Sequence, residues 1–218
     1  TMKFLDQAID LVSTSYKAMI IYNEGDFFSA GANVGEALFL GNIGLENELV
    51  ENIIENGQKV YQKLKYSDFP VIAAPSSMAL GGGCELLLHS DHIQAHVETY
   101  VGLTEAALGI CPAWGGCKEL LDRLSKVKFS AKGPMPAIMK AFQTIGMAKT
   151  STSAHEAKEI GFLKESDGIT MNRDRLLFDA KLVAVKMTKS YSPPDKIVFK
   201  LPGKTALSAL IIGLNGMK

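Results

Sequence analysis

Residues 71–88 read VIAAPSSMALGGGCELLL, and this stretch decides the fold. Its first four residues predict a buried strand, because an unbroken apolar run with β-branched members suits a strand covered on both faces. Three glycines follow at 81–83, and the leucine-rich segment 84–88 after them predicts a helix. A strand, a glycine turn and a helix in this order indicate an α/β protein with a parallel sheet.

The rest of the chain continues this alternation. Upstream, the apolar spacing predicts a helix over 4–15, a strand over 19–22, helical turns over 34–40 and a helix over 45–64. Downstream we expect strands over 93–97 and 100–103. After them we expect helices only, over 115–124, 134–147, 154–160, 173–189 and 205–214, with the proline-containing stretch 190–204 as an irregular connector.

Composition excludes several classes of protein. The 218 residues are 47% hydrophobic and 21% charged, which is ordinary for a soluble globular chain. Equal numbers of acidic and basic residues, 23 of each, argue against a nucleic-acid partner. No apolar run approaches the roughly 20 residues that a membrane span needs. With only 3 cysteines a disulfide framework is not expected, which favours a reducing, cytoplasmic location.

The glycines at 81–83 are the first candidate site. Backbone N–H groups at the start of a helix, together with the helix dipole, can bind a negative charge. The same glycines also suit a tight strand-to-helix turn with no ligand. A second small-residue loop, Ser29–Ala32, follows the strand at 19–22, and ligands collect at the carboxyl ends of parallel strands. Two such loops could supply two N–H donors to one oxygen.

Two acids lie in mostly apolar surroundings. Glu85 falls in the first turn of the helix that follows the glycines, where a surface acid is the simplest interpretation. The leucines at 86–88 indicate that much of this helix is buried. Glu105 lies in the apolar, small-residue stretch 101–109. Carboxyls in such surroundings are candidates for a raised pKa and for acid–base chemistry.

Other kinds of site have little support. His89, His92 and His96 straddle a helix end and a strand, which is poor spacing for a metal, and the cysteines form no C-x-x-C pair. The nucleotide-binding motif G-x-G-x-x-G, the P-loop and the hydrolase motif G-x-S-x-G are absent from the sequence.

Three segments resemble signatures of the crotonase, or enoyl-CoA hydratase/isomerase, family. Residues 27–33, FFSAGAN, resemble its F-x-A-G-A-D loop, and residues 71–86 resemble its glycine-rich signature almost residue for residue. Residues 104–116, TEAALGICPAWGG, resemble its P-E-x-x-L-G-x-x-P-G-x-G-G segment, with Ala113 in place of a glycine. Residues 22–25, 132–136 and 167–175 are similar to the hydratase region of multifunctional fatty-acid oxidation proteins, which also contain a 3-hydroxyacyl-CoA dehydrogenase.

The resemblance implies an acyl-CoA substrate and a defined set of site residues. The backbone N–H groups of Ala32 and Gly82 would form the oxyanion hole for the thioester oxygen. Glu85 and Glu105 would flank the water that adds to the 2,3 double bond, and which of them accepts the proton is left open. The expected substrate-binding residues are Ala30, Gly31, Ala32, Gly81, Gly82, Pro112, Ala113 and Trp114.

The resemblance also implies the architecture and partners. The expected fold is the ClpP/crotonase spiral of ββα units with a C-terminal helical region. Residues 1–130 would be the core, without the usual first hairpin, which suggests a fragment of a longer polypeptide. Residues 131–190 would be a trimerisation-type region and 191–218 a linker with a final helix. We expect a trimer or hexamer, or docking with a dehydrogenase portion. No metal or cofactor is expected for this chain. NAD would be needed only if a separate dehydrogenase portion exists.

Two alternatives to the hydratase remain open at this point. A Δ3,Δ2-enoyl-CoA isomerase of the same family can work with one acid, so the two acids favour hydration without excluding isomerisation. The missing hairpin also suits a truncated, non-catalytic module that binds acyl-CoA or serves assembly.

Overall fold

A computed structural model of the chain describes residues 1–31, 46–128 and 131–215. Helix α1 (Met2–Ser15), strand β1 (Met19–Tyr22) and the long helix α3 (Glu46–Lys65) come first. Then follow β2 (Val71–Ala74), β3 (Met78–Leu80), α4 (Gly82–His89), β4 (His92–His96), β5 (Tyr100–Gly102) and the 3₁₀ helix η1 (Glu105–Leu108). The remaining elements are α5 (Gly116–Ser125), α6 (Met135–Gly146), α7 (Ala154–Ile160), β6 (Gly168–Thr170), the 3₁₀ helix η2 (Arg173–Arg175), α8 (Leu176–Met187) and α9 (Lys204–Asn215).

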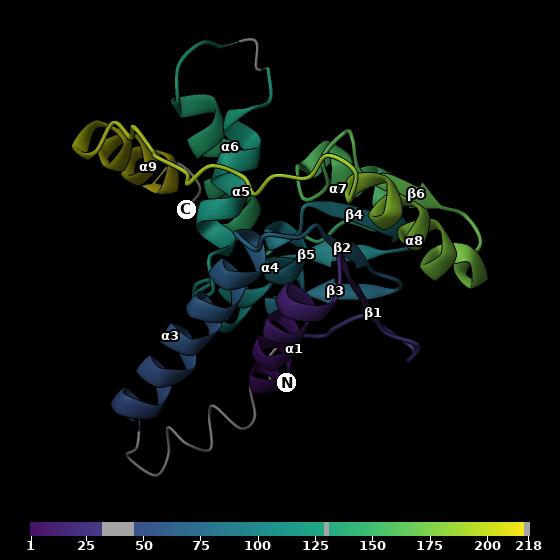
Figure 1. Cartoon of the computed structure of the whole chain (residues 1–218). Coiled ribbons are helices and arrows are strands. Elements are labelled where there is room, and N and C mark those ends of the chain that lie inside the picture. The colour runs from purple at the N-terminus through teal and green to yellow at the C-terminus, as the bar shows by residue number, and fades with distance from the viewer. Residues whose placement is uncertain (32–45, 129–130, 216–218) are drawn as a thin grey trace.

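The strands form two parallel sheets. The larger has the order β1-β2-β4-β6, and the smaller pairs β3 with β5. Within the larger sheet Met19 lies opposite Val71, and Ile72 opposite His92. The parallel pairing confirms the predicted α/β class. Figure 1 shows α8 beside this sheet, and α5 and α6 side by side at the other end of the molecule, with α9 beyond them.

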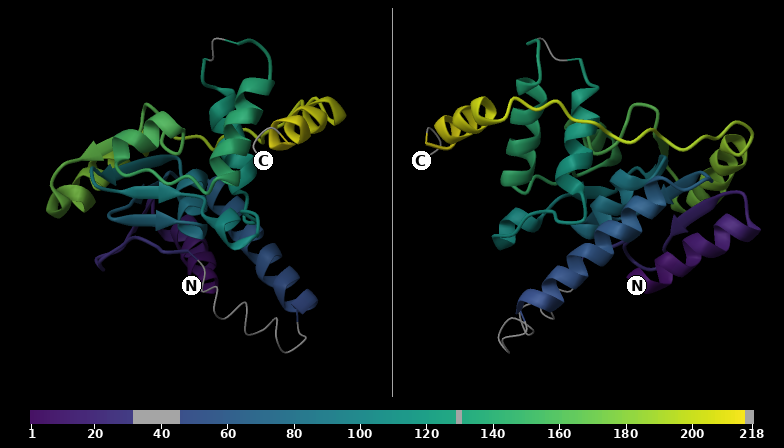
Figure 2. Two further views of the ribbon diagram at one scale, coloured as in Figure 1. Left: turned by 180° about the vertical axis from the view of Figure 1, so that it is seen from behind. Right: turned by 60° about the vertical axis from the view of Figure 1, so that its left-hand side comes forward.

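Strand β2, at the start of the stretch 71–88, lies at the centre of the fold. All four residues of β2 are buried, because each face of the strand meets a different helical layer. Val71 packs with α1 and α3, through Leu5, Ile9, Val60 and Leu64. Ile72 and Ala74, on the opposite face, pack against Leu176, Ala180 and Ala184 of α8. Figure 2 shows α3 and α1 side by side and projecting from the body of the molecule.

The sequence prediction was wrong in several places. It did not assign a strand between residue 74 and the glycines at 81–83, but Met78–Leu80 forms β3 and pairs in parallel with β5. It had helices only after residue 103, but Gly168–Thr170 forms β6 and pairs in parallel with β4. Asp167 places this strand, because its carboxylate accepts hydrogen bonds from the N–H groups of Ile93 at 3.0 Å and Lys164 at 2.7 Å. The glycine-turn helix also begins two residues earlier than predicted, at Gly82. The helical turns expected over 34–40 lie outside the described residues.

The irregular connector predicted over 190–204 is confirmed, since the described backbone has no regular structure from residue 191 to residue 202. Over residues 1–31, 46–128 and 131–215, no helix is both long enough and apolar enough to cross a membrane.

Candidate active site

The two small-residue loops meet. A Cβ placed on Gly31 would lie 3.6 Å from the backbone nitrogen of Gly82 and 3.7 Å from the Cα of Gly81. The loop after β1 and the start of α4 are therefore in van der Waals contact. This contact is the arrangement that two N–H donors directed at one oxygen require.

Backbone pairing explains why the loops meet. Ser29 forms a parallel bridge with Ala79 of β3, so the loop runs beside that strand. The Ser29 N–H donates to the Met78 carbonyl at 2.8 Å, and the Leu80 N–H donates to the Ser29 carbonyl at 2.9 Å. Position 83, where α4 lies against this loop, requires glycine, because a Cβ on Gly83 would lie 2.6 Å from the Ser29 Cβ.

Both loops turn through backbone conformations that favour glycine. Gly31 has φ 90° and Gly81 has φ 53°. The turn at Gly81 starts α4, so Gly82 is its first residue and the Gly82 N–H has no acceptor within the helix. The positive end of the helix dipole lies at the same point. The start of α4 is thus suited to hold a developing negative charge.

Glu85 lies one turn into α4 and is almost completely buried, with 2% of its surface exposed. Its Oε1 accepts a hydrogen bond from the Gly116 N–H at 2.8 Å, at the start of α5. Burial, with a smaller contribution from the nearby charge of Glu105, raises the pKa of the Glu85 carboxyl to about 7. The N–H groups of Gly116 and Trp114 act in the opposite direction. This carboxyl can therefore gain or lose a proton near neutral pH.

Glu105 begins η1 and lies against the glycine turn. A Cβ on Gly81 would lie 3.3 Å from Glu105 Oε1. The other oxygen, Oε2, is buried and has no hydrogen-bond partner among the described residues. Burial raises the pKa of this carboxyl as well. Both predicted acids therefore flank the same turn, and the charge of Glu105 is one of the causes of the raised pKa of Glu85.

The predicted segment 112–114 closes the site on the side of α5. Pro112 is buried, and Ala113 and Trp114 are half-buried. The Ala113 carbonyl accepts a hydrogen bond at 2.8 Å from Gln58 Nε2 of α3. The Trp114 ring lies over Gly82, where a Cβ would meet its Cζ3 at 2.8 Å. Ala30 and Gly31 are exposed. Ala32, the expected second donor, lies outside the described residues.

Sequence reasoning missed the contribution of α3. Tyr61 donates a hydrogen bond from its hydroxyl to the Gly82 carbonyl at 2.8 Å, and its ring packs edge-on against Trp114. Gly57, one turn earlier, is needed because a Cβ there would lie 2.1 Å from Trp114 Nε1. A glycine inside a helix costs about 1 kcal/mol relative to alanine. Its presence inside the helix predicted over 45–64 was therefore the available sign that another residue packs closely at this position.

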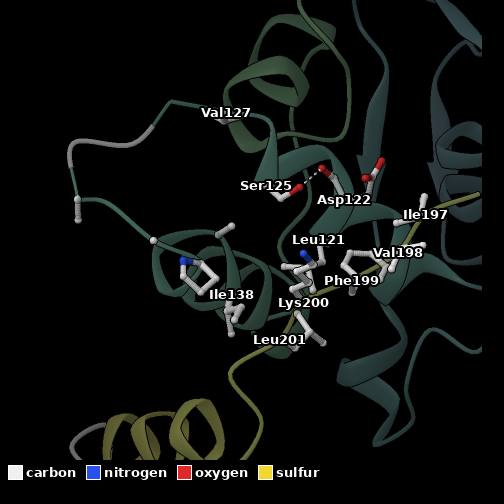
Figure 3. A pocket seen from close by; sticks show the side chains of 14 residues that line it. Leu121, Asp122, Ser125, Val127, Ile138, Ile197, Val198, Phe199, Lys200 and Leu201 are labelled. Carbon is white, nitrogen blue, oxygen red and sulfur yellow. Dashed lines mark hydrogen bonds between the residues drawn. The ribbon is translucent and has the colours of Figure 1, made fainter. Parts of the chain in front are cut away.

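Two cavities lie away from the paired acids. One, of about 340 Å³, is bounded by α5, α6 and residues 197–201, and Figure 3 shows Leu121, Ile138 and Phe199 around it. Another, of about 770 Å³, has lysines and acids in nearly equal number along its wall. Neither lining includes Glu85 or Glu105, so these cavities are separate from the candidate active site.

The site combines a helix start that can bind an oxyanion with two carboxyls of raised pKa. No cluster of three potential metal ligands occurs among the residues whose placement is described. The chemistry available to these groups is stabilisation of negative charge on an oxygen and movement of protons beside it.

Comparison with known proteins supports this interpretation. The profile of the family described as enoyl-CoA hydratase/isomerase matches residues 2–168. A Bacillus subtilis protein named "Probable 3-hydroxyacyl-CoA dehydrogenase" is 41% identical over 100% of this chain and 27% of its own length. A Rickettsia felis protein named "Putative fatty acid oxidation complex trifunctional enzyme" is 32% identical over 88% of this chain and 25% of its own length. The chain thus spans about a quarter of these relatives.

Solved structures agree with the fold. The crystal structure of an enoyl-CoA hydratase from Bacillus anthracis matches 88% of this chain and 67% of its own, with a TM-score of 0.70 and 26% identity. A Geobacillus kaustophilus structure, described as "Crystal structure of Enoyl-CoA hydrates", matches 87% of this chain and 65% of its own, with a TM-score of 0.70 and 23% identity. The second likeness concerns the fold alone.

Proposed function

The chain belongs to the enoyl-CoA hydratase/isomerase family, and from this premise we propose that it adds water to the 2,3 double bond of 2-enoyl-CoA thioesters in fatty-acid β-oxidation. The observation that carries the proposal is the convergence of both acids on the glycine turn. Glu105 Oε1 lies against Gly81, and Glu85 lies one turn after Gly82 in the same helix. The names of the Bacillus subtilis and Rickettsia felis relatives support a place in fatty-acid oxidation.

In the proposed reaction the Gly82 N–H donates to the thioester oxygen, and Ala32 in the adjoining loop supplies the second donor. One carboxylate takes a proton from water while the water oxygen bonds to C3. The electrons of the double bond move toward C2 and the thioester oxygen, where the fixed N–H groups stabilise the charge. C2 then takes a proton from the carboxyl that accepted it from water, or from the other acid, in which case a proton passes from the first carboxyl to the second. The product has then gained H and OH, and both acids have returned to their starting states.

This mechanism asks for no metal or redox cofactor, since proton transfer and fixed dipoles supply the chemistry. Coenzyme A is part of the substrate. NAD would be needed only by a dehydrogenase portion of a longer polypeptide. We also propose a cytoplasmic location, which the free thiols of Cys84, Cys111 and Cys117 support.

The test is to offer the purified chain crotonyl-CoA and a 3-enoyl-CoA in parallel. We expect crotonyl-CoA to lose its conjugated double bond, which is measured as a fall in the absorbance of that bond. Conversion of the 3-enoyl isomer should be slower or absent. Faster conversion of the 3-enoyl substrate would instead assign an isomerase. Tight binding of both substrates without conversion of either would assign a non-catalytic module.

We further propose that the chain is divided into a core at 1–130, a helical region at 131–190 and a linker with a final helix at 191–218. The helical region would mediate assembly into a trimer or hexamer, or docking with a dehydrogenase portion. Phe178, Leu182 and Val185 follow one another along one face of α8 and are 52%, 56% and 55% exposed. Such an apolar stripe is typical of an interface. Sedimentation of the purified chain is expected to give the mass of three or six copies, and a monomer would contradict self-assembly.

A further inference from the structure

A buried polar cluster lies directly behind the candidate active site, and the proposed reaction makes no use of its side chains. Tyr61, His89 and Glu119 come from α3, α4 and α5 and are 3%, 2% and 1% exposed. Lys65 and Lys118 pair with the Glu119 carboxylate and balance its charge. Burying a polar group is costly unless it is hydrogen-bonded, so the hydrogen-bond partners of Tyr61 and His89 are informative.

Tyr61 holds the residue that carries the oxyanion donor. Its hydroxyl donates to the Gly82 carbonyl at 2.8 Å. The Trp114 ring packs on Gly82 and meets the Tyr61 ring edge-on, with centroids 5.5 Å apart. A glycine has no side chain to limit its own backbone, so these contacts fix the direction of the Gly82 N–H.

His89 holds the residue that carries the buried acid. Its Nδ1 lies 2.7 Å from the Glu85 carbonyl oxygen. A carbonyl only accepts, so Nδ1 carries the proton. Burial lowers the pKa of His89 to about 4, which keeps the ring neutral and leaves Nε2 without a proton. Nε2 lies 3.6 Å from Glu119 Oε1, beyond hydrogen-bond distance, and Nε2 has no hydrogen-bond partner within the described part of the chain.

The position of His89 therefore does not depend on an ion pair with Glu119. The Tyr61 ring lies against it with centroids 5.3 Å apart, and a Cβ on Gly115 would lie 2.9 Å from its Cε1. The ring is clamped between α3 and the start of α5, and its one directed hydrogen bond goes to Glu85. One aromatic pair thus contacts the carbonyls of both Gly82 and Glu85.

We propose that Tyr61 and His89 are positioning residues of the hydration reaction, which hold the Gly82 and Glu85 carbonyls so that the donor N–H and the buried carboxyl keep a fixed separation. The inference rests on the proposed function. Neither side chain touches substrate. Their removal should therefore lower kcat and leave KM nearly unchanged, because the substrate contacts remain while their alignment in the transition state is lost.

The experiment compares four variants with the native chain on crotonyl-CoA. Tyr61→Phe removes only the hydroxyl, and His89→Leu removes the donor to Glu85. His89→Asn keeps an N–H at the place of Nδ1. Tyr191→Phe is the matched control, since the Tyr191 hydroxyl lies 3.3 Å from the Ser67 carbonyl and 3.0 Å from Asp91 Oδ2, among residues that take no part in the proposed reaction. Thermal melts establish that each variant is folded.

We expect kcat to fall about tenfold in Tyr61→Phe and His89→Leu, with KM within about twofold of native, as loss of one aligning hydrogen bond predicts. His89→Asn should recover most of the loss, and Tyr191→Phe should keep native kcat. Native kcat in Tyr61→Phe, or an equal loss in the leucine and asparagine variants, would overturn the inference while an active native chain still supports the proposed function. If Tyr61→Phe does not fold, the two His89 variants decide. An inactive native chain would overturn both.

Discussion

Replacing Glu85 or Glu105 with glutamine is expected to lower kcat for crotonyl-CoA hydration by about a thousandfold, because each change removes a group that can exchange a proton with water or C2. Glutamine keeps the size of the side chain. Its carbonyl oxygen at position 85 can still accept the Gly116 N–H that Glu85 Oε1 accepts at 2.8 Å. The fold should therefore survive, and the loss should fall on kcat rather than on substrate binding.

The matched control for these variants is Glu98→Gln, which alters an exposed glutamate in the turn between β4 and β5. It removes the same charge from the chain but should hydrate at the native rate. Native rates in both Glu85→Gln and Glu105→Gln would contradict the catalytic assignment. A large loss in only one of them would leave a single-acid mechanism, as the isomerase alternative requires.

The second large effect is on the stability of Glu85→Gln, which is expected to rise although the activity of this variant falls. Burial raises the pKa of Glu85 from 4.5 to about 7 in the folded chain. The folded state therefore keeps a proton that the unfolded state releases, and stability falls as the pH rises from about 4.5 to about 7. A shift of this size corresponds to about 3 kcal/mol, since each pKa unit is worth about 1.4 kcal/mol. Glu85→Gln has no charge to bury.

At pH 8, Glu85→Gln is accordingly expected to be more stable than the native chain by about 3 kcal/mol, and the difference should shrink below about 1 kcal/mol at pH 5. Urea unfolding of both proteins at the two pH values measures it. When the unfolding free energies of the two proteins are compared at the same pH, the contributions from the titration of all groups that they share cancel. Equal stability at pH 8 would mean that the Glu85 carboxylate is not strained by burial and would remove the basis for its titration near neutral pH.

The two effects together describe a site that is maintained at a cost in stability. A carboxyl with 2% exposure is more stable in its neutral form, yet the proposed chemistry needs a group that can change its protonation state. The substitution that stabilises the fold is thus expected to lower turnover strongly, which is the usual relation between stability and activity at active sites.

The sequence predicted the strand–turn–helix units well because their signals are local. Residues 71–74 have no polar residue, so they predicted a strand covered on both faces, and β2 is buried at every position. The glycines at 81–83 predicted a turn with a special backbone, and Gly81 has φ 53°. The acids were identified from their apolar neighbours, and both carboxyls have a raised pKa that burial explains.

The features that the sequence did not predict depend on contacts between distant segments. Strand β6 has only three residues, Gly168–Thr170, which is too short to show a period of two. It is a strand because Asp167 binds the backbone of β4 and places it there. The hydrogen bond of Tyr61 to Gly82 joins α3 to α4. In the sequence, Gly57 signals close packing one turn earlier, but the hydrogen bond itself has no local signal. The position of the two loops after parallel strands allowed Gly31 and Gly82 to lie close together, and the resemblance to a family supported it.

The most direct test of the account is a crystal structure of the Glu85→Gln variant with crotonyl-CoA, in which slow turnover preserves the substrate. The account predicts the thioester oxygen about 2.7–3.1 Å from the Gly82 backbone nitrogen, with C3 of the alkene facing the side chains at 85 and 105. A thioester oxygen pointing away from the glycine turn, or an alkene remote from both side chains, would contradict it.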